Sequence, residues 1–165
     1  MVKVASRITP LAAVVLTLML PGSLLAAEPG KPARTLADRE SDYYKIVSLP
    51  TPEGVQFEAG GLQFVGPDDL ACSTRTGDIW IGKGAVSNPT ATKWKLFESG
   101  LHEVLSLAWK DGWIYALQRG ELTRLKDTTG DGRADIVETV CDGWGINGDY
   151  HEYIFGSKFD RDGNM

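Results

Sequence analysis

The sequence predicts an all-β fold built from repeated antiparallel meanders, and three observations predict it. Residues 62–81 align without a gap onto residues 105–124, at a spacing of 43 positions. Short apolar or alternating runs are separated by turns rich in Asp and Gly, a pattern typical of strands joined by tight turns. No strong amphipathic helix follows the N-terminal apolar run. Because a period near 43 residues is typical of propeller blades, we expect two to three four-stranded blades of a β-propeller.

The N-terminus has the order of a secretory signal. Lys3 and Arg7 precede the apolar residues 11–25, and small residues suited to cleavage follow. The apolar run of about 15 residues is short for a membrane span, and the alternative is an uncleaved N-terminal anchor. We therefore expect residues 1–27 to be a signal peptide and the protein to be exported, periplasmic or extracellular. No transmembrane segment is expected after cleavage, and residues 28–42 are expected to be a linker.

Residues 43–165 are expected to form the blades. The predicted strands of the two copies are 61–65, 70–74 and 79–81, then 105–109, 113–117 and 122–125, with a further strand at 137–141. A third copy is expected to start with a strand and an acidic turn in residues 157–165. The sequence stops after this turn, where both earlier copies open a strand, and propellers typically have four or more blades. We expect a truncated, N-terminal piece of the ring; the alternative is a small sheet assembly that pairs with copies of itself.

Charge and cysteine content restrict the partners. Seventeen Lys and Arg oppose 22 Asp and Glu, a net charge of −5, and cleavage after residue 27 would make the charge more negative. There is no basic patch, so nucleic acid is not expected as a partner. Cys72 and Cys141 could form a disulfide in an exported protein or could be two small buried residues.

The segment 127–138 (DTTGDGRADIVE) matches the spacing of a twelve-residue calcium loop, with Gly132 at the sharp bend. Thr at the third position removes one carboxylate, and the flanking residues predict strands rather than helices. The candidate calcium ligands are Asp127, Thr129, Asp131, Arg133 through its carbonyl, Asp135 and Glu138. The alternative is an Asp- and Gly-rich surface turn that binds no metal.

His151 is the candidate catalytic base. It is flanked by acidic and tyrosine side chains, and a neighbouring carboxylate can fix the tautomer of a histidine and raise its basicity. His102-Glu103 and His151-Glu152 each precede the expected first strand of a blade, so the two pairs could line the same end of a channel and hold a metal. The alternative is a surface histidine that bonds a nearby carbonyl.

The segments LACSTRTGDIWI, HEVLSLAWKDGWIYALQRGELTRLKDTTGDGRAD and GDYHEYIFGSKFDRDGN resemble the first blades of glucose/sorbosone dehydrogenase-like propellers. They resemble in particular the large exported propeller proteins of planctomycetes, which often carry a c-type haem domain. The resemblance covers about residues 43–165 and implies a six-bladed ring when complete. It also implies pyrroloquinoline quinone and calcium at the channel, with His151 abstracting the substrate hydroxyl proton. Glu152 and Tyr153 stand where the family has paired glycines, and its quinone-contacting Gln has no match here.

Two functions follow as expectations. The first is a quinone-dependent sugar or alcohol dehydrogenase when full length, with a haem-c electron acceptor if a downstream domain exists; the fragment itself should be inactive. The second is a non-catalytic propeller that binds carbohydrate or protein partners. Because propellers host many activities, the resemblance transfers the fold better than the chemistry.

Overall fold

The computed structural model describes residues 2–7, 35–146, 148–149 and 153–165. They fall into two compact units: one is formed by residues from Lys3–Val47, and the other by Ser48–Met165 together with Val2. Strands β1 (Val2–Arg7) and β2 (Tyr44–Leu49) pair as a two-stranded sheet. Most of the predicted signal peptide and the start of the linker, residues 8–34, lie outside the described residues.

The predicted linker contains a short helix, α1 (Leu36–Glu40). Thr35 starts it through a reciprocal cap: the Thr35 hydroxyl accepts a hydrogen bond from the amide of Asp38, and the Asp38 carboxylate accepts one from the amide of Thr35. Two amides at the helix start are thereby satisfied. The helix and its cap lie within the predicted linker, and the sequence analysis expected no helix there.

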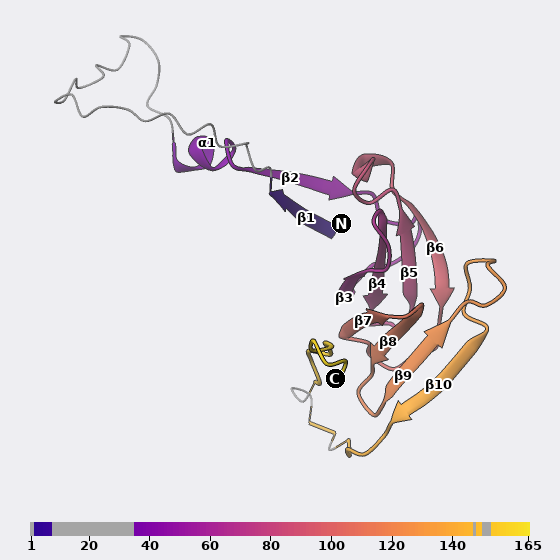
Figure 1. The fold of residues 1–165 in the computed structure, drawn as a ribbon. Helices are drawn as coiled ribbons and strands as arrows, with labels where there is room; N and C mark the ends of the chain where they lie inside the picture. Colours follow the sequence, from indigo (N-terminus) through magenta and orange to yellow (C-terminus); the bar gives the residue numbers. More distant parts are fainter. Residues whose placement is uncertain (1, 8–34, 147, 150–152) are drawn as a thin grey trace, which may run out of the picture. The chain divides into compact units, whose positions relative to one another are not determined.

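The larger unit consists of two four-stranded antiparallel sheets, which confirms the all-β prediction (Figure 1). Consecutive strands pair throughout both sheets, as in a meander. The first sheet contains β3 (Ala59–Phe64), β4 (Asp69–Thr74), β5 (Ile79–Lys83) and β6 (Lys93–Glu98), with a 3₁₀ turn, η1 (Pro89–Ala91), before β6. The second sheet contains β7 (Ser106–Lys110), β8 (Trp113–Leu117), β9 (Leu122–Lys126) and β10 (Ile136–Cys141).

The repeat of 43 residues matches the last three strands of each sheet. Strands β4, β5 and β6 end at residues 74, 83 and 98, and β8, β9 and β10 end 43 positions later, at residues 117, 126 and 141. The ungapped alignment is wrong for the first strand, because Phe64 pairs with Leu70 whereas Leu107 pairs with Ala116. The β7–β8 turn has only two residues, at 111 and 112, both with positive φ. The pairing of β7 with β8 therefore extends up to Lys110 and Trp113, next to the turn.

The hydrophobic core lies between the two sheets. It is formed by Ala71, Ile79, Phe97, Val104, Leu107, Ile114, Ala116 and Leu125. Strands β3 and β7 lie side by side, and the glycine pair Gly60–Gly61 makes this approach possible. A Cβ on Gly60 would lie 2.3 Å from the Val104 carbonyl oxygen, and one on Gly61 would lie 2.9 Å from the Leu107 nitrogen. A larger residue at either position would push the two strands apart.

The strand predicted for the third copy, in residues 157–165, is not formed: residues 153–160 are outside regular secondary structure. The amide of Ser157 instead donates to the Ser106 hydroxyl at 2.9 Å, a side-chain contact and not a strand ladder. The Lys158 ammonium donates to Gln63 Oε1 at 2.9 Å and to the Leu107 carbonyl at 3.3 Å. The segment therefore lies along the first strands of both sheets, and the predicted acidic turn follows it, with the amide of Gly163 bonded to the carbonyl of Asp160.

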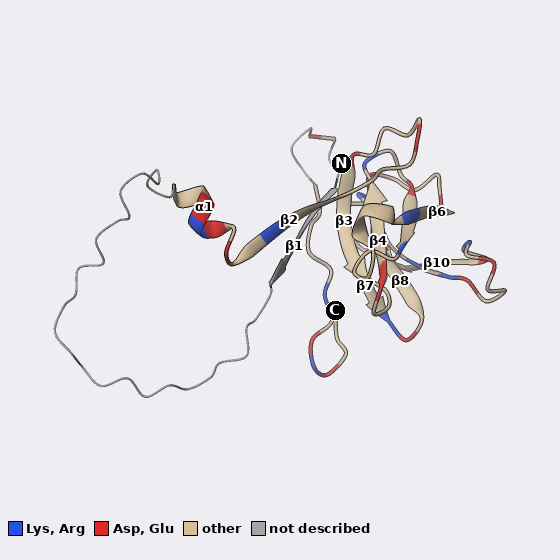
Figure 2. Ribbon diagram, turned by 90° about the horizontal axis from the view of Figure 1, so that it is seen from above, with Lys and Arg blue, Asp and Glu red and all other residues tan. Residues whose placement is uncertain are grey.

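Charged residues are spread over the loops and strand ends of the larger unit. Figure 2 shows Lys and Arg among Asp and Glu, with no element carrying a single sign over its whole length. No helix within the described residues is long and apolar enough to cross a membrane.

Candidate functional site

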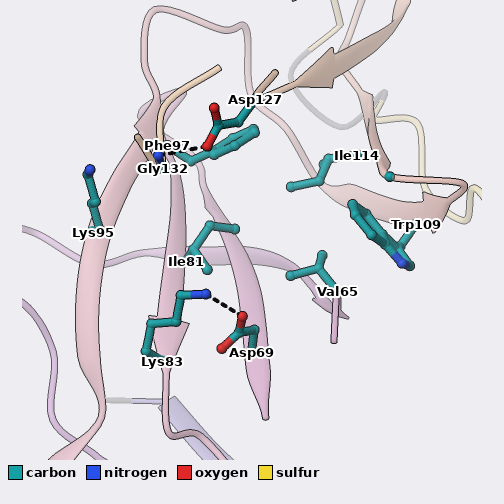
Figure 3. A pocket seen from close by; sticks show the side chains of 11 residues that line it. Val65, Asp69, Ile81, Lys83, Lys95, Phe97, Trp109, Ile114, Asp127 and Gly132 are labelled. Carbon is teal, nitrogen blue, oxygen red and sulfur yellow. Dashed lines mark hydrogen bonds and ion pairs between the residues drawn. The ribbon is translucent and has the colours of Figure 1, made fainter. Parts of the chain in front are cut away.

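A pocket of about 270 Å³ opens between the two sheets (Figure 3). Ile81 of β5 and Phe97 of β6 form the wall from the first sheet. Ile114 of β8 and Trp109 of β7 form the wall from the second sheet, and Val65 follows directly after β3. The alternation of side chains along each strand directs these residues into the space between the sheets. These side chains make the inside of the pocket apolar. Trp109 is 38% exposed and offers an accessible aromatic side chain.

Charged groups surround this apolar pocket. The Lys83 ammonium pairs with the Asp69 carboxylate at 2.5 Å, and Figure 3 shows this pair at one end and Asp127 at the other. Lys95 also lines the pocket, and its ammonium donates to the carbonyl of Asp131. The pocket is therefore lined by two cationic and two anionic side chains.

The segment 127–138 contributes to the pocket wall through Asp127 and Gly132. Asp127 Oδ1 accepts a hydrogen bond from the amide of Gly130, and Oδ2 accepts one from the amide of Gly132, both at 2.7 Å. Partial burial alone would raise the pKa of Asp127, but these bonds and those from Thr129 hold it below its usual value. The loop is thus closed on itself by its first carboxylate.

The other candidate calcium ligands are engaged in separate contacts. The Asp135 carboxylate accepts from the amides of Thr128 and Thr129, and Asp131 accepts from the amide of Arg133. Glu138 lies within β10, where its carboxylate pairs with Arg124 at 2.6 Å. The candidate ligands are neighbours in the sequence, but their carboxylates do not point toward one common position in the structure. Within the described residues, no group of three or more His, Cys, Asp or Glu is placed to hold a metal.

The same loop joins the two sheets. The amide of Ala134 donates to the carbonyl of Phe97 at 3.0 Å, and Lys95 reaches the Asp131 carbonyl from β6. The outer strand of the first sheet is therefore bonded to the loop that connects β9 to β10. The spacing of residues 127–138 predicted a metal loop or a surface turn, and nothing in it predicted the contacts with β6.

A second cluster lies near the start of β7 and the turn between β8 and β9. The Glu103 carboxylate lies 3.2 Å from Arg119 Nη1 and 3.8 Å from His102 Nε2. Glu103 has a φ of 47°, a left-handed conformation that costs free energy in a residue with a side chain. Arg119 Nη2 donates to the Asp149 carbonyl at 2.7 Å, and its guanidinium lies 5.5 Å from the centre of the Tyr153 ring.

His151 and Glu152 lie outside the described residues, so the structure does not place the candidate base. Their described neighbours Asp149 and Tyr153 both contact Arg119. The sequence singled out His102 but not Arg119. Arg119 lies in the turn between β8 and β9, and its contacts with Glu103 and Asp149 become visible only in the structure.

Both cysteines are free thiols. Cys72 is buried in β4, and burial raises the pKa of its thiol to about 12, so it stays protonated. Cys141 is exposed at the end of β10. The predicted alternatives were a disulfide or two buried thiols. Cys72 is a buried thiol, whereas Cys141 is neither buried nor in a disulfide.

No protein-family model, no curated protein and no solved structure matches this chain.

Proposed function

We propose that the two sheets are neighbouring blades of a β-propeller, and that the protein is an exported oxidoreductase acting on a sugar or an alcohol. The observation that supports the architecture is the close approach of β3 and β7, the first strand of each meander. Gly60 and Gly61 permit this approach, and Lys158 continues it by contacting both strands. In a propeller the first strands surround the central channel, so these residues would face it.

Two sheets do not close a ring. In this proposal further sheets complete it, either from a longer form of the polypeptide or from other copies. The residues that precede β7 and the residues near position 151 would then lie at the same end of the channel, since Arg119 contacts both Glu103 and Asp149.

The proposed chemistry is the oxidation of a hydroxyl group. His151 would take the hydroxyl proton while the carbon-bound hydrogen leaves as hydride, which gives the carbonyl product. Pyrroloquinoline quinone, when bound, would accept the hydride and both of its electrons, and a haem-c domain could then accept electrons from it. This role of His151 comes from its sequence context and from the family resemblance.

Calcium fits the present arrangement of the loop poorly. Asp127 and Asp135 already accept bonds from loop amides, and Glu138 pairs with Arg124. Calcium binding would require these carboxylates to exchange partners, and no step is assigned to the ion. The quinone-contacting Gln expected from the resemblance has no match in the sequence, so no residue is assigned to the quinone.

The test uses the longest natural form of the polypeptide, with quinone and calcium added, and measures dye reduction across a panel of sugars and alcohols. We expect His151→Asn to lower the rate by about 100-fold or more, the range for a general base. Lys93→Gln, at an exposed position at the start of the outer strand β6, is the control and should keep most of the activity. Absence of both quinone binding and dye reduction in a folded protein would reject the dehydrogenase proposal.

A further inference from the structure

We propose that the pocket between the two sheets binds a small neutral ring that carries hydroxyl groups, of monosaccharide size. This inference does not use His151 and is independent of the oxidation proposed above. It rests on the walls, the charges and the volume of the pocket, all of which lie within the described residues.

The walls favour a ligand with an apolar face. Ile81 and Phe97 face Ile114 and Trp109 across the opening (Figure 3). The C–H groups of a saturated ring carry a slight positive charge and pack well on the face of an aromatic ring. An indole with more than a third of its surface accessible, as in Trp109, offers such a contact at the pocket mouth.

The charges favour a ligand without net charge. Two ammonium groups, of Lys83 and Lys95, and two carboxylates, of Asp69 and Asp127, line the pocket. These four charges cancel, so a carboxylate or an amine would be attracted by one pair and repelled by the other, with little net gain. A hydroxyl group can accept from an ammonium and donate to a carboxylate, so each hydroxyl of a neutral ligand can use either kind of partner.

The volume limits the size of the ligand. Pockets for drug-sized molecules hold about 300–1,000 Å³, and this pocket of about 270 Å³ lies just below that range. One six-membered ring with its hydroxyls is therefore the natural limit. We expect a dissociation constant of about 1–10 mM, because few contacts contribute and the ligand loses its freedom on binding.

The experiment is a ¹H–¹⁵N NMR titration of the chain with a panel of monosaccharides, without quinone or calcium. We expect saturable shifts at the Trp109 indole and at the amides of Gly112 and Gly132. Asp69→Asn should weaken binding about 5-fold, since a charged hydrogen-bond acceptor is lost. Glu58→Gln is the matched control: Glu58 also forms an exposed ion pair, with Arg75 at 2.8 Å, but it does not line the pocket.

Hexanoate and hexylamine serve as two charged probes of equal chain length, the first negative and the second positive. Saturation by either probe at these residues, with no response to sugars, would overturn the proposal. So would sugar-induced shifts confined to other residues, the absence of any saturable shift, or equal weakening by Asp69→Asn and Glu58→Gln. Failure here leaves the dye-reduction test unaffected, because that test concerns His151 and the channel.

Discussion

The Ser73 hydroxyl donates a hydrogen bond to the Val104 carbonyl at 2.8 Å, and so connects the first sheet to the residues that lead into the second. The same oxygen accepts from the amide of Gly61 at 2.7 Å. Ser73 is fully buried. One hydroxyl thus satisfies two buried backbone groups at the point where β3 approaches the second sheet.

Ser73→Ala should therefore destabilise the protein by about 1–3 kcal/mol, because it leaves a buried amide and a buried carbonyl without their partner. The measurement is urea unfolding followed by tryptophan fluorescence. Ser99→Ala, at an exposed position, is the control and should change stability by less than about 0.5 kcal/mol. Equal stability of the two variants would show that Ser73 does not join the sheets.

The loop carboxylate Asp127 should make stability depend on pH in acid. Its pKa is lowered in the folded protein, so it binds a proton less readily there than in the unfolded chain. Its contribution is present above the unfolded value of about 3.9 and is lost as the pH falls through the lower folded value. Asp127→Asn should lower the melting temperature at pH 7, and the difference from wild type should shrink below about pH 4. A difference that stays constant from pH 7 to pH 3 would contradict this account.

Strands β4, β5, β8, β9 and β10 could be predicted from the sequence, because their runs are apolar or alternating and are joined by turns with Gly or Asp. Strand β6 (Lys93–Glu98) was not among the predicted strands. The ends of β5 and β9, at Lys83 and Lys126, follow the repeat without adjustment. The first strand could not be aligned correctly, because its register depends on the length of the following turn. Asp111 and Gly112 close that turn in two residues in the second sheet only.

The candidate site was less predictable than the fold. Trp109 and Ile81 lie in different sheets, and nothing local in the sequence indicates that they share a pocket. The spacing of the segment 127–138 predicted converging carboxylates, but Glu138 belongs to β10 and faces Arg124 across the strand pair. The spacing of the sequence gives only the order of the possible ligands. Glu138, the last of them, belongs to the strand that starts at Ile136, and the strand fixes its position.

The candidate calcium loop, residues 127–138, can be tested through Lys95, which contacts it from β6. Its ammonium donates to the Asp131 carbonyl, so its positive charge lies next to the loop and would repel a cation bound there. Lys95→Gln should therefore raise calcium affinity by about 3- to 10-fold, because a like charge near the loop is removed. Asp131→Ala should lower the affinity, since it removes a carboxylate whose only other described partner is the amide of Arg133. Isothermal titration calorimetry compares the three proteins, and identical heats for all would reject calcium binding by the loop.

Arg119 should contribute more to stability than the nearby Arg124, although both form ion pairs. The Arg119 side chain is 16% exposed and bonds Glu103 and the carbonyl of Asp149. The Arg124 side chain is 38% exposed and pairs with Glu138. Arg119→Met should cost about 2 kcal/mol, because hydrogen bonds to a charged group are lost in a partly buried site. Arg124→Met should cost less than Arg119→Met, because the pair with Glu138 is exposed and the contact with the Trp113 ring, 4.4 Å from the guanidinium to the ring centre, adds only a small gain.

Urea unfolding of the two variants measures these costs. Hydrogen exchange adds a local readout: Arg119→Met should increase exchange at the amides of Asp149 and Tyr153, whereas Arg124→Met should leave them unchanged. If both variants lose the same stability and neither changes exchange at these two amides, Arg119 does not link the residues before β7 to the segment that carries His151.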